Sequence, residues 1–161
     1  MKVLLINGSP RANDACGEAV RRAEAQLAGA GAETGVFWPV KTENLPCSGC
    51  GACRGAGMCV ADPRAGEFLR AAAQSDGFMI AAPVGLLGLG MDLRNLLKRA
   101  AELAARSRNN PFAGKPAAPL IIGRLNRRAA RELRELTQAL GLELCELTAF
   151  SPTLIKKEAE K

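Results

Sequence analysis

Four of the six cysteines stand close together between residues 47 and 59. They are Cys47, Cys50, Cys53 and Cys59, in the spacing C-x2-C-x2-C-x5-C. The chain has no histidine, which excludes Ser-His-Asp triads and every metal site that needs an imidazole. A reducing compartment disfavours a disulfide framework for such a group. The spacing therefore predicts a metal site built from thiolates.

The spacing of these cysteines favours an iron–sulfur cluster over zinc. Three cysteines at successive intervals of two residues wrap one face of a cubane, whereas a tetrahedral zinc site commonly takes ligands from two separated segments. Intervening glycines permit tight turns and leave backbone N–H groups for the cluster sulfurs. They are Gly49, Gly51, Gly55 and Gly57. We interpret the loop as a [4Fe–4S] site, with zinc as the alternative metal and a metal-free thiol loop as the third interpretation.

A second chemical feature is the run Gly8-Ser9-Pro10-Arg11, which directly follows the apolar residues 3–6 and opens a predicted helix. A turn of this kind presents backbone N–H groups and a helix N-terminus, both of which favour a phosphate. The Ser9 hydroxyl can donate a hydrogen bond, and the Arg11 guanidinium can form a charged fork with phosphate oxygens. The alternative is an ordinary helix cap beside a solvated arginine.

A third feature is the apolar, glycine-rich loop that follows the third predicted strand. It begins Pro83-Val84-Gly85-Leu86 and runs to residue 91. A flat apolar ring fits against such a loop, with backbone amides bonding the edge of the ring. The alternative is a hydrophobic loop that a partner chain buries.

Strand and helix patterns alternate from end to end and position these loops. Strands are predicted at 3–6, 34–40, 78–82, 118–122 and 142–147, and helices at 13–29, 64–75, 91–107 and 126–140. This alternation predicts an α/β, flavodoxin-like three-layer sandwich with a five-stranded parallel sheet in the order 2-1-3-4-5. We expect one domain at 1–150, with the cysteine loop at 46–63, and a tail at 151–161. Cys16 and Cys145 are expected to be buried as small apolar side chains.

Composition limits the classes of partner. The chain has 161 residues, a net charge of +6, no tyrosine and one tryptophan, so an aromatic platform for stacking bases is absent and nucleic acid is not expected. No apolar stretch approaches the ~18 residues of a membrane helix, so no membrane partner is expected. The first residues have only a short apolar run and no small-residue cleavage site. We therefore expect a cytoplasmic protein.

Together these features resemble the iron–sulfur flavoprotein branch of the NADPH-dependent FMN reductase-like group. The residues that carry the resemblance are Gly8-Ser9-Pro10-Arg11, the loop from Cys47 to Cys59, Pro83-Val84, Leu93, Arg94, Arg99 and Ala113-Gly114-Lys115-Pro116. The resemblance implies a [4Fe–4S] cluster on the four cysteines and an oxidoreductase that needs no catalytic acid or base of its own. It also implies FMN, held by Ser9, Arg11, Asn13, Pro83, Val84, Gly85, Leu86 and Gly123.

The resemblance further implies NAD(P)H or a reduced carrier as electron donor and a homo-oligomer, either a dimer or a tetramer. The cysteine loop follows the second predicted strand and the apolar loop follows the third, and these two strands flank the first in the predicted order. We therefore expect the cluster and the flavin to lie close together, within one chain or across a subunit contact. The sequence departs from the family pattern at several positions: Asp14 brings a carboxylate to the phosphate loop, Gly85 stands where an aromatic residue is usual, and the turn at Gly123 lacks the usual consecutive glycines. Two alternatives stay open. One is a flavin or quinone reductase whose cysteine loop is structural or zinc-bound, and the other is a non-enzymatic flavodoxin-fold module that has lost its flavin.

Overall fold

The central strands of the sheet form from continuous apolar runs, as expected of parallel strands that are buried on both faces. The computed structural model describes residues 1–11, 13–39, 47–56, 58–85, 88–123, 126–146 and 148–150, without side-chain detail at 55, 56 and 148–150. β1 (Lys2–Asn7) lies between β2 (Glu33–Phe37) and β3 (Gly77–Gly85), and β3 pairs with β5 (Pro116–Ile122), all in parallel. The order β2-β1-β3-β5 matches the first four positions of the predicted topology.

The fifth position of the sheet differs from the prediction. Two short strands occupy it: β6 (Glu143–Leu144) pairs with the start of β5, and β7 (Thr148–Phe150) pairs with the end of β5. The interruption falls opposite Ala118 and Pro119, and a proline has no N–H to donate to a strand ladder. Cys145 lies in this interruption and is exposed, so the prediction that it is buried is wrong. The tail predicted at 151–161 lies outside the described residues.

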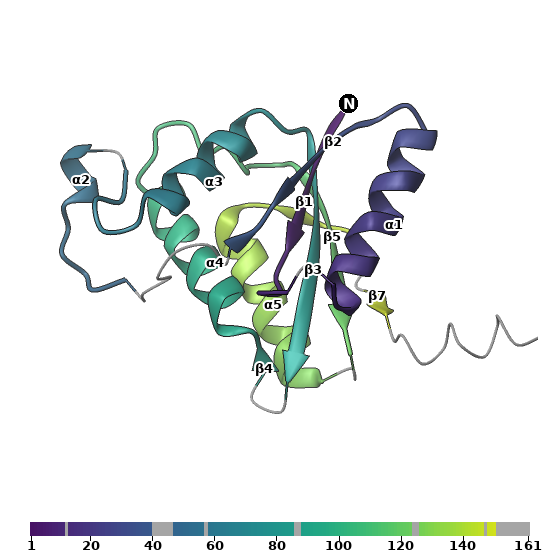
Figure 1. Cartoon of the computed structure of the whole chain (residues 1–161). Coiled ribbons are helices and arrows are strands. Elements are labelled where there is room, and N and C mark those ends of the chain that lie inside the picture. The colour runs from purple at the N-terminus through teal and green to yellow at the C-terminus, as the bar shows by residue number, and fades with distance from the viewer. Residues whose placement is uncertain are drawn as a thin grey trace, which may run out of the picture.

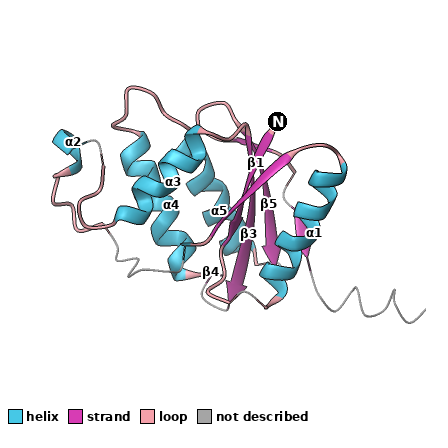
Figure 2. Ribbon diagram, turned by 45° about the horizontal axis from the view of Figure 1, so that its top comes forward, coloured by secondary structure: helices cyan, strands magenta, loops and turns pink. Residues whose placement is uncertain are grey.

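Helices cover the two faces of the sheet unequally, as Figures 1 and 2 show. α1 (Ala15–Gly29) packs on one face and buries an apolar cluster against β1 and β3. α3 (Pro63–Ala73), α4 (Met91–Ala104) and α5 (Arg127–Leu140) pack on the other face, around the larger of the two apolar clusters. These layers confirm the predicted three-layer α/β sandwich.

Two short elements were not predicted. α2 (Cys53–Ala56) is a single turn within the cysteine loop. β4 (Gly88–Leu89) turns back antiparallel to the end of β3, opposite Val84 and Gly85. β4 therefore brings Gly88 and Leu89 back beside the end of β3.

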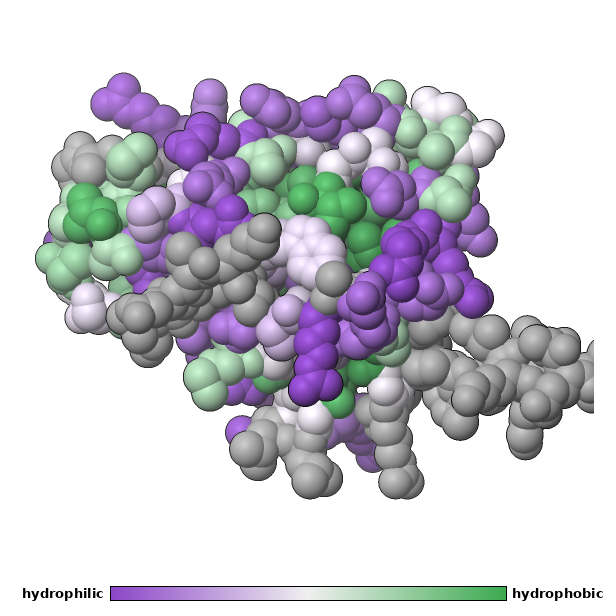
Figure 3. All heavy atoms as spheres, in the orientation of Figure 1, coloured by the Kyte–Doolittle hydropathy of each residue, from purple (hydrophilic) through white to green (hydrophobic). Residues whose placement is uncertain are grey.

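Polar side chains cover most of the face seen in Figure 3, and an apolar area lies between α3 and α1, where β2 forms the edge of the sheet. Within the described ranges, no helix is both long enough and apolar enough to cross a lipid bilayer.

Close packing at Gly8 joins the loops after β1 and β3. The Gly8 N–H donates to the Ala81 carbonyl oxygen at 2.9 Å. A Cβ atom on Gly8 would lie 2.7 Å from that oxygen and 2.8 Å from both Leu93 Cδ2 and Pro83 Cδ. These neighbours come from β3 and the first turn of α4, so the absence of a side chain at Gly8 lets the two candidate flavin loops meet.

Gly8→Ala should lower the free energy of unfolding by about 2 kcal/mol, because the added methyl group overlaps atoms that are fixed by the sheet and by α4. Urea unfolding followed by circular dichroism measures the change. Gly29→Ala is the matched control. A Cβ atom there meets nothing within 4 Å, and alanine is the better helix former, so this variant should be as stable as the parent or up to about 1 kcal/mol more stable. Equal stability of the two variants would contradict this account of Gly8.

Candidate functional site

The loop after β1 is a buried polar turn. Asn7 and Ser9 are 0% and 2% exposed, and Asn7 Oδ1 accepts a hydrogen bond from the Ser9 N–H at 3.1 Å. Ser9 Oγ accepts from the Arg11 N–H at 3.2 Å. The side chains of Arg11 and Asn13 are exposed beyond this turn. The structure thus places Ser9, Arg11 and Asn13 in one turn at the carboxyl edge of the sheet.

Asp14 caps the helix that follows this turn. Its Oδ1 accepts from the N–H groups of Cys16 and Gly17 at 2.9 and 3.0 Å, and its Oδ2 accepts a short hydrogen bond from the Ser9 hydroxyl. A phosphate at a helix N-terminus would use donors of this kind. The same carboxylate faces Cys16: burial, followed by the charge of Asp14, raises the pKa of the Cys16 thiol to about 12. Cys16 is 1% exposed, as predicted.

The loop after β3 offers an apolar surface beside this turn. Pro83 and Val84 are half-buried, and Gly85 is exposed, with nothing within 4 Å of the position that a Cβ atom would take. Gly123, at the end of β5, has φ of +115°, and a Cβ atom on it would lie 3.5 Å from the Val84 carbonyl oxygen. The structure therefore brings Pro83, Val84, Gly85 and Gly123 together. Leu86, the remaining predicted contact, lies outside the described residues.

The loop after β3 and the turn after β1 differ in how well they fit FMN. The half-buried Pro83 and Val84, with open space above Gly85, fit one face of a planar ring. The phosphate end does not fit in the same way, because the Asp14 carboxylate already accepts from two backbone N–H groups and from the Ser9 hydroxyl. A phosphate would meet like charge there.

The cysteine loop lies against α4 rather than over the sheet edge. Cys47 and Cys50 are exposed, and Cys53 and Cys59 are half-buried. Arg99 Nη1 donates to Cys59 Sγ at 2.8 Å, and Arg106 Nη1 donates to Cys53 Sγ at 2.9 Å. In the part of the chain that the structure describes, no three Cys, Asp or Glu side chains gather into a metal-binding group. The donor chemistry fits a cluster, because this loop carries four soft thiols and two of their sulfurs each accept a hydrogen bond from a guanidinium group.

A buried ion pair anchors the Cys59 end of this loop. Arg99 and Asp62 are 4% and 3% exposed, and Arg99 Nε lies 3.1 Å from Asp62 Oδ2. Asp62 also caps α3, since its Oδ1 accepts from the Arg64 N–H at 3.1 Å. One guanidinium thus connects α4, the start of α3 and the Cys59 sulfur.

Arg106 lies at the other end of the loop, just beyond the end of α4. Its hydrogen bond to the Cys53 sulfur, together with the charges of Cys53, Glu102 and Cys47, raises the pKa of Arg106 above its usual value. The guanidinium is therefore a permanent positive charge beside two cysteines of the loop.

The flavin loops and the cysteine loop contact different parts of α4. Gly8 and Pro83 pack at Leu93 and Gly90, at the beginning of the helix, whereas Cys59 contacts Arg99. Met91 and Arg99 are roughly 12 Å apart along the helix axis at 1.5 Å per residue. Figures 1 and 2 both show α2 lying beyond α3 and α4 as seen from the sheet. The structure does not bring the two loops together within one chain.

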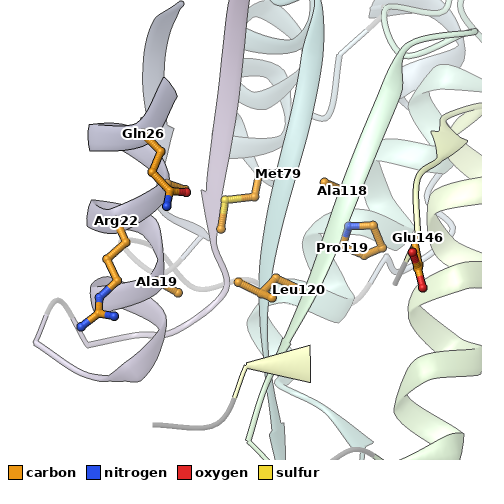
Figure 4. A pocket seen from close by; sticks show the side chains of 9 residues that line it. Ala19, Arg22, Gln26, Met79, Ala118, Pro119, Leu120 and Glu146 are labelled. Atoms are coloured by element: carbon orange, nitrogen blue, oxygen red, sulfur yellow. The ribbon is translucent and has the colours of Figure 1, made fainter. Parts of the chain in front are cut away.

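Two hollows lie away from the edge that carries the flavin loops. One, of about 500 Å³, is lined by α4, α5 and Cys47. The other, of about 400 Å³, lies between α1 and the middle of β3 and β5. Figure 4 shows its apolar lining of Met79, Pro119 and Leu120, with Arg22 and Glu146 on its two sides. Among the described residues that line the second hollow, Glu146 is the one carboxylate that could ligate a metal, and none is a nucleophile of the Ser, Thr or Cys kind.

Sequence reasoning missed three of the side chains that shape these sites. They are Asn7, Asp62 and Arg106. A signal existed for Arg106, because Arg99 and Arg106 are seven residues apart in a predicted helix and therefore share a face. A signal existed for Asp62 as well, because an aspartate directly before Pro63 is typical of a helix N-cap. Neither signal indicated that Arg106 would bond the Cys53 sulfur or that Asp62 would pair with Arg99, which bonds the Cys59 sulfur.

Comparison with known proteins identifies relatives along most of the chain. The sequence profile of the family described as NADPH-dependent FMN reductase matches residues 1–158. An iron–sulfur flavoprotein of Methanosarcina thermophila is 32% identical over 123 residues, which cover 76% of this chain and 63% of the relative. An iron–sulfur flavoprotein of Methanocaldococcus jannaschii is 33% identical over 103 residues, which cover 64% of this chain and 53% of the relative. The chain thus spans less than two thirds of the length of either relative.

Solved structures show the same fold at low sequence identity. An NADH:FMN oxidoreductase in its apo form superposes with a TM-score of 0.68 at 17% identity, covering 98% of this chain and 79% of the other. A flavodoxin from the domain Archaea superposes with a TM-score of 0.62 at 10% identity, covering 94% of this chain and 83% of the other. These likenesses confirm the flavodoxin-like fold.

Asp62→Asn should lower the free energy of unfolding by about 3 kcal/mol, because it leaves the buried Arg99 guanidinium without its carboxylate. Asparagine still caps α3, so the variant isolates the charge. Urea unfolding at pH 7 measures the loss. Glu135→Gln removes the carboxylate of the exposed Arg131–Glu135 pair and should change stability little. A loss no larger than that of the control would show that the buried pair does not stabilise the fold.

Proposed function

The chain belongs to the NADPH-dependent FMN reductase family, and on that premise we propose that it is a flavin-dependent redox protein that also holds a [4Fe–4S] cluster. It passes electrons between NAD(P)H, or a reduced carrier, and an acceptor. The observation that carries this proposal is the cysteine loop, in which two sulfurs each accept a hydrogen bond from a guanidinium. The two iron–sulfur flavoproteins that match this chain support it.

Each part of the chain has a separate role in this proposal. Pro83, Val84 and Gly85 support one face of the flavin ring, and the turn at Ser9 holds the ribityl end. Cys47, Cys50, Cys53 and Cys59 are the cluster ligands. When bound, the flavin exchanges two electrons with a nicotinamide, and the cluster exchanges single electrons. The chain's own residues position these groups and set the charge around them.

Arg99 and Arg106 stabilise negative charge on the loop. Thiolate ligands carry negative charge, and hydrogen bonds to sulfur tune both ligand basicity and redox potential. The positive charge of Arg99 is balanced by the carboxylate of Asp62, so Arg99 mainly fixes Cys59 in place. Arg106 has a half-exposed guanidinium that pairs with Glu102, and it mainly contributes charge. We therefore assign a positioning role to Arg99 and an electrostatic role to Arg106.

The separation along α4 favours electron transfer between subunits. The flavin loops lie at the start of this helix, and the cysteines that contact Arg99 and Arg106 lie along its second half and just beyond its end. A second copy of the chain can bring its own edge of flavin loops to the exposed Cys47 and Cys50. This arrangement makes a homo-oligomer part of the proposal.

A second candidate is a flavin or quinone reductase in which the cysteine loop is structural or zinc-bound. The observation that favours it is that Cys53 and Cys59 bond to different arginines and that, among the described residues, no three ligands gather. Metal and sulfide analysis separates the two candidates, because only the first requires acid-labile sulfide.

Anaerobic purification followed by reconstitution with iron and sulfide tests the proposal. The protein should be brown and contain about four iron and four sulfide per chain, and its bound flavin should bleach on addition of NADPH or NADH. Cys53→Ser should lose most of the iron, whereas Cys145→Ser, at an exposed cysteine outside the loop, should keep it. A colourless, iron-free product would reject the cluster. Stoichiometric zinc with no sulfide would select the second candidate.

Arg106→Gln should shift the reduction potential of the cluster to a more negative value, by an amount on the order of tens of millivolts. Reduction adds negative charge to the cluster, and the substitution removes a positive charge that hydrogen-bonds Cys53. Spectroscopic redox titration measures the shift, and iron content should stay unchanged. Arg131→Gln, at an exposed site on α5, is the control and should leave the potential where it is. A positive shift, or equal shifts in both variants, would contradict the assigned role.

A further inference from the structure

The turn after β1 already contains an anion of its own. The Asp14 carboxylate accepts hydrogen bonds from the N–H groups of Cys16 and Gly17 and from the Ser9 hydroxyl. These three donors belong to a helix N-terminus and an adjoining loop at the junction of β1 and β3, which is where ligands bind in this type of sheet. A chain that used these donors for a phosphate would have to leave them free.

The remaining donors at the turn are few. Arg11 and Asn13 have exposed side chains, and an exposed charge attracts an anion only weakly in water. Asn7 is fully buried, and its Nδ2 has no hydrogen-bond partner among the described residues. Its Oδ1 bonds the Ser9 N–H, so this unpaired amino group belongs to the same turn. A ligand that accepts a hydrogen bond from Asn7 Nδ2 and donates one to the Asp14 carboxylate would pair with both side chains.

A hydroxyl group meets both needs, and a phosphate dianion does not. A hydroxyl oxygen accepts from an amide N–H and its proton can be donated to a carboxylate. A phosphate at the same place would compete with Asp14 for the helix N-terminus and would be repelled by it at short range. The ribityl chain of a flavin carries such hydroxyl groups whether or not it ends in a phosphate.

We propose that Asp14 makes this chain recognise the ring and ribityl chain of a flavin without gaining affinity from the 5′-phosphate. This inference rests on the proposed flavin-binding function and specifies its ligand class: free flavins, with FMN and riboflavin held about equally. The flavin is then an exchangeable ligand, because the contact that would anchor a phosphate is made by the chain itself.

Equilibrium titration of the flavin-free, full-length protein with FMN and with riboflavin tests the inference through the quenching of flavin fluorescence. The two dissociation constants should agree within about threefold in the parent chain. In Asp14→Asn the affinity for FMN should rise about tenfold or more, and the affinity for riboflavin should change less than about twofold. Asparagine is as good a helix cap as aspartate, so α1 should stay intact, which urea unfolding verifies.

Glu143→Gln is the matched control. It removes one carboxylate from the exposed β6, which pairs with the opposite end of β5, so both dissociation constants should match those of the parent. An equal gain in FMN affinity in this control would assign the effect to net charge and overturn the role of Asp14.

The remaining outcomes are distinct. A parent chain that prefers FMN by more than about tenfold, or an Asp14→Asn variant with an unchanged ratio, would overturn the inference while leaving flavin binding in place. Binding of neither flavin to either protein would overturn the proposed flavin function and the inference with it.

Discussion

The arrangement of the cysteine loop depends on the pairing of the buried Arg99 guanidinium with Asp62 and Cys59. A charge that is 4% exposed must be paired, and Arg99 meets this need with Asp62 on one side and Cys59 on the other. Asp62 in turn begins α3, and Arg99 itself lies in the middle of α4. Since both helices pack on the sheet, the last cysteine of the loop is fixed relative to the core, although the loop lies outside it.

How far the sequence predicts the molecule depends on the range of the interaction. The helices and the central strands follow from local periodicity, the order of the first four parallel strands follows from the alternation of these elements, and the loops at Ser9 and Pro83 lie at the predicted edge of the sheet. Contacts between distant residues do not follow. Cys59 and Arg99 are 40 residues apart and Cys53 and Arg106 are 53 apart, and no periodicity relates them. The split of the fifth strand has the same origin, because it depends on which residues of β5 lie opposite it.

The flavin loops and the cysteine loop contact different parts of α4, although the order of the strands predicts that they lie together. The cysteine loop follows β2 and the apolar flavin loop follows β3; these strands flank β1 at one edge of the sheet, which favours a common location. The described part of the cysteine loop nevertheless lies on the outer side of α3 and α4, where Arg99 and Arg106 contact Cys59 and Cys53. A helix that packs its apolar face on the sheet has only its other faces available for a metal loop. The two sites are therefore separated along α4, with the flavin loops at Leu93 in its first turn and the cysteine loop at Arg99 further along the helix.

The cysteine loop and the start of α1 are two positions that suit an anion, and the chain places side chains of opposite charge at them. At the cysteine loop, guanidinium groups meet sulfur atoms that carry or can acquire negative charge, so a ligand that adds negative charge there is stabilised. At the start of α1, a carboxylate meets backbone N–H groups, so a ligand that adds negative charge there is opposed. The net charge of +6 does not change this contrast, because Arg11 is exposed to solvent while Asp14 contacts the donors directly. Short-range geometry rather than overall charge thus decides which ligand each position accepts.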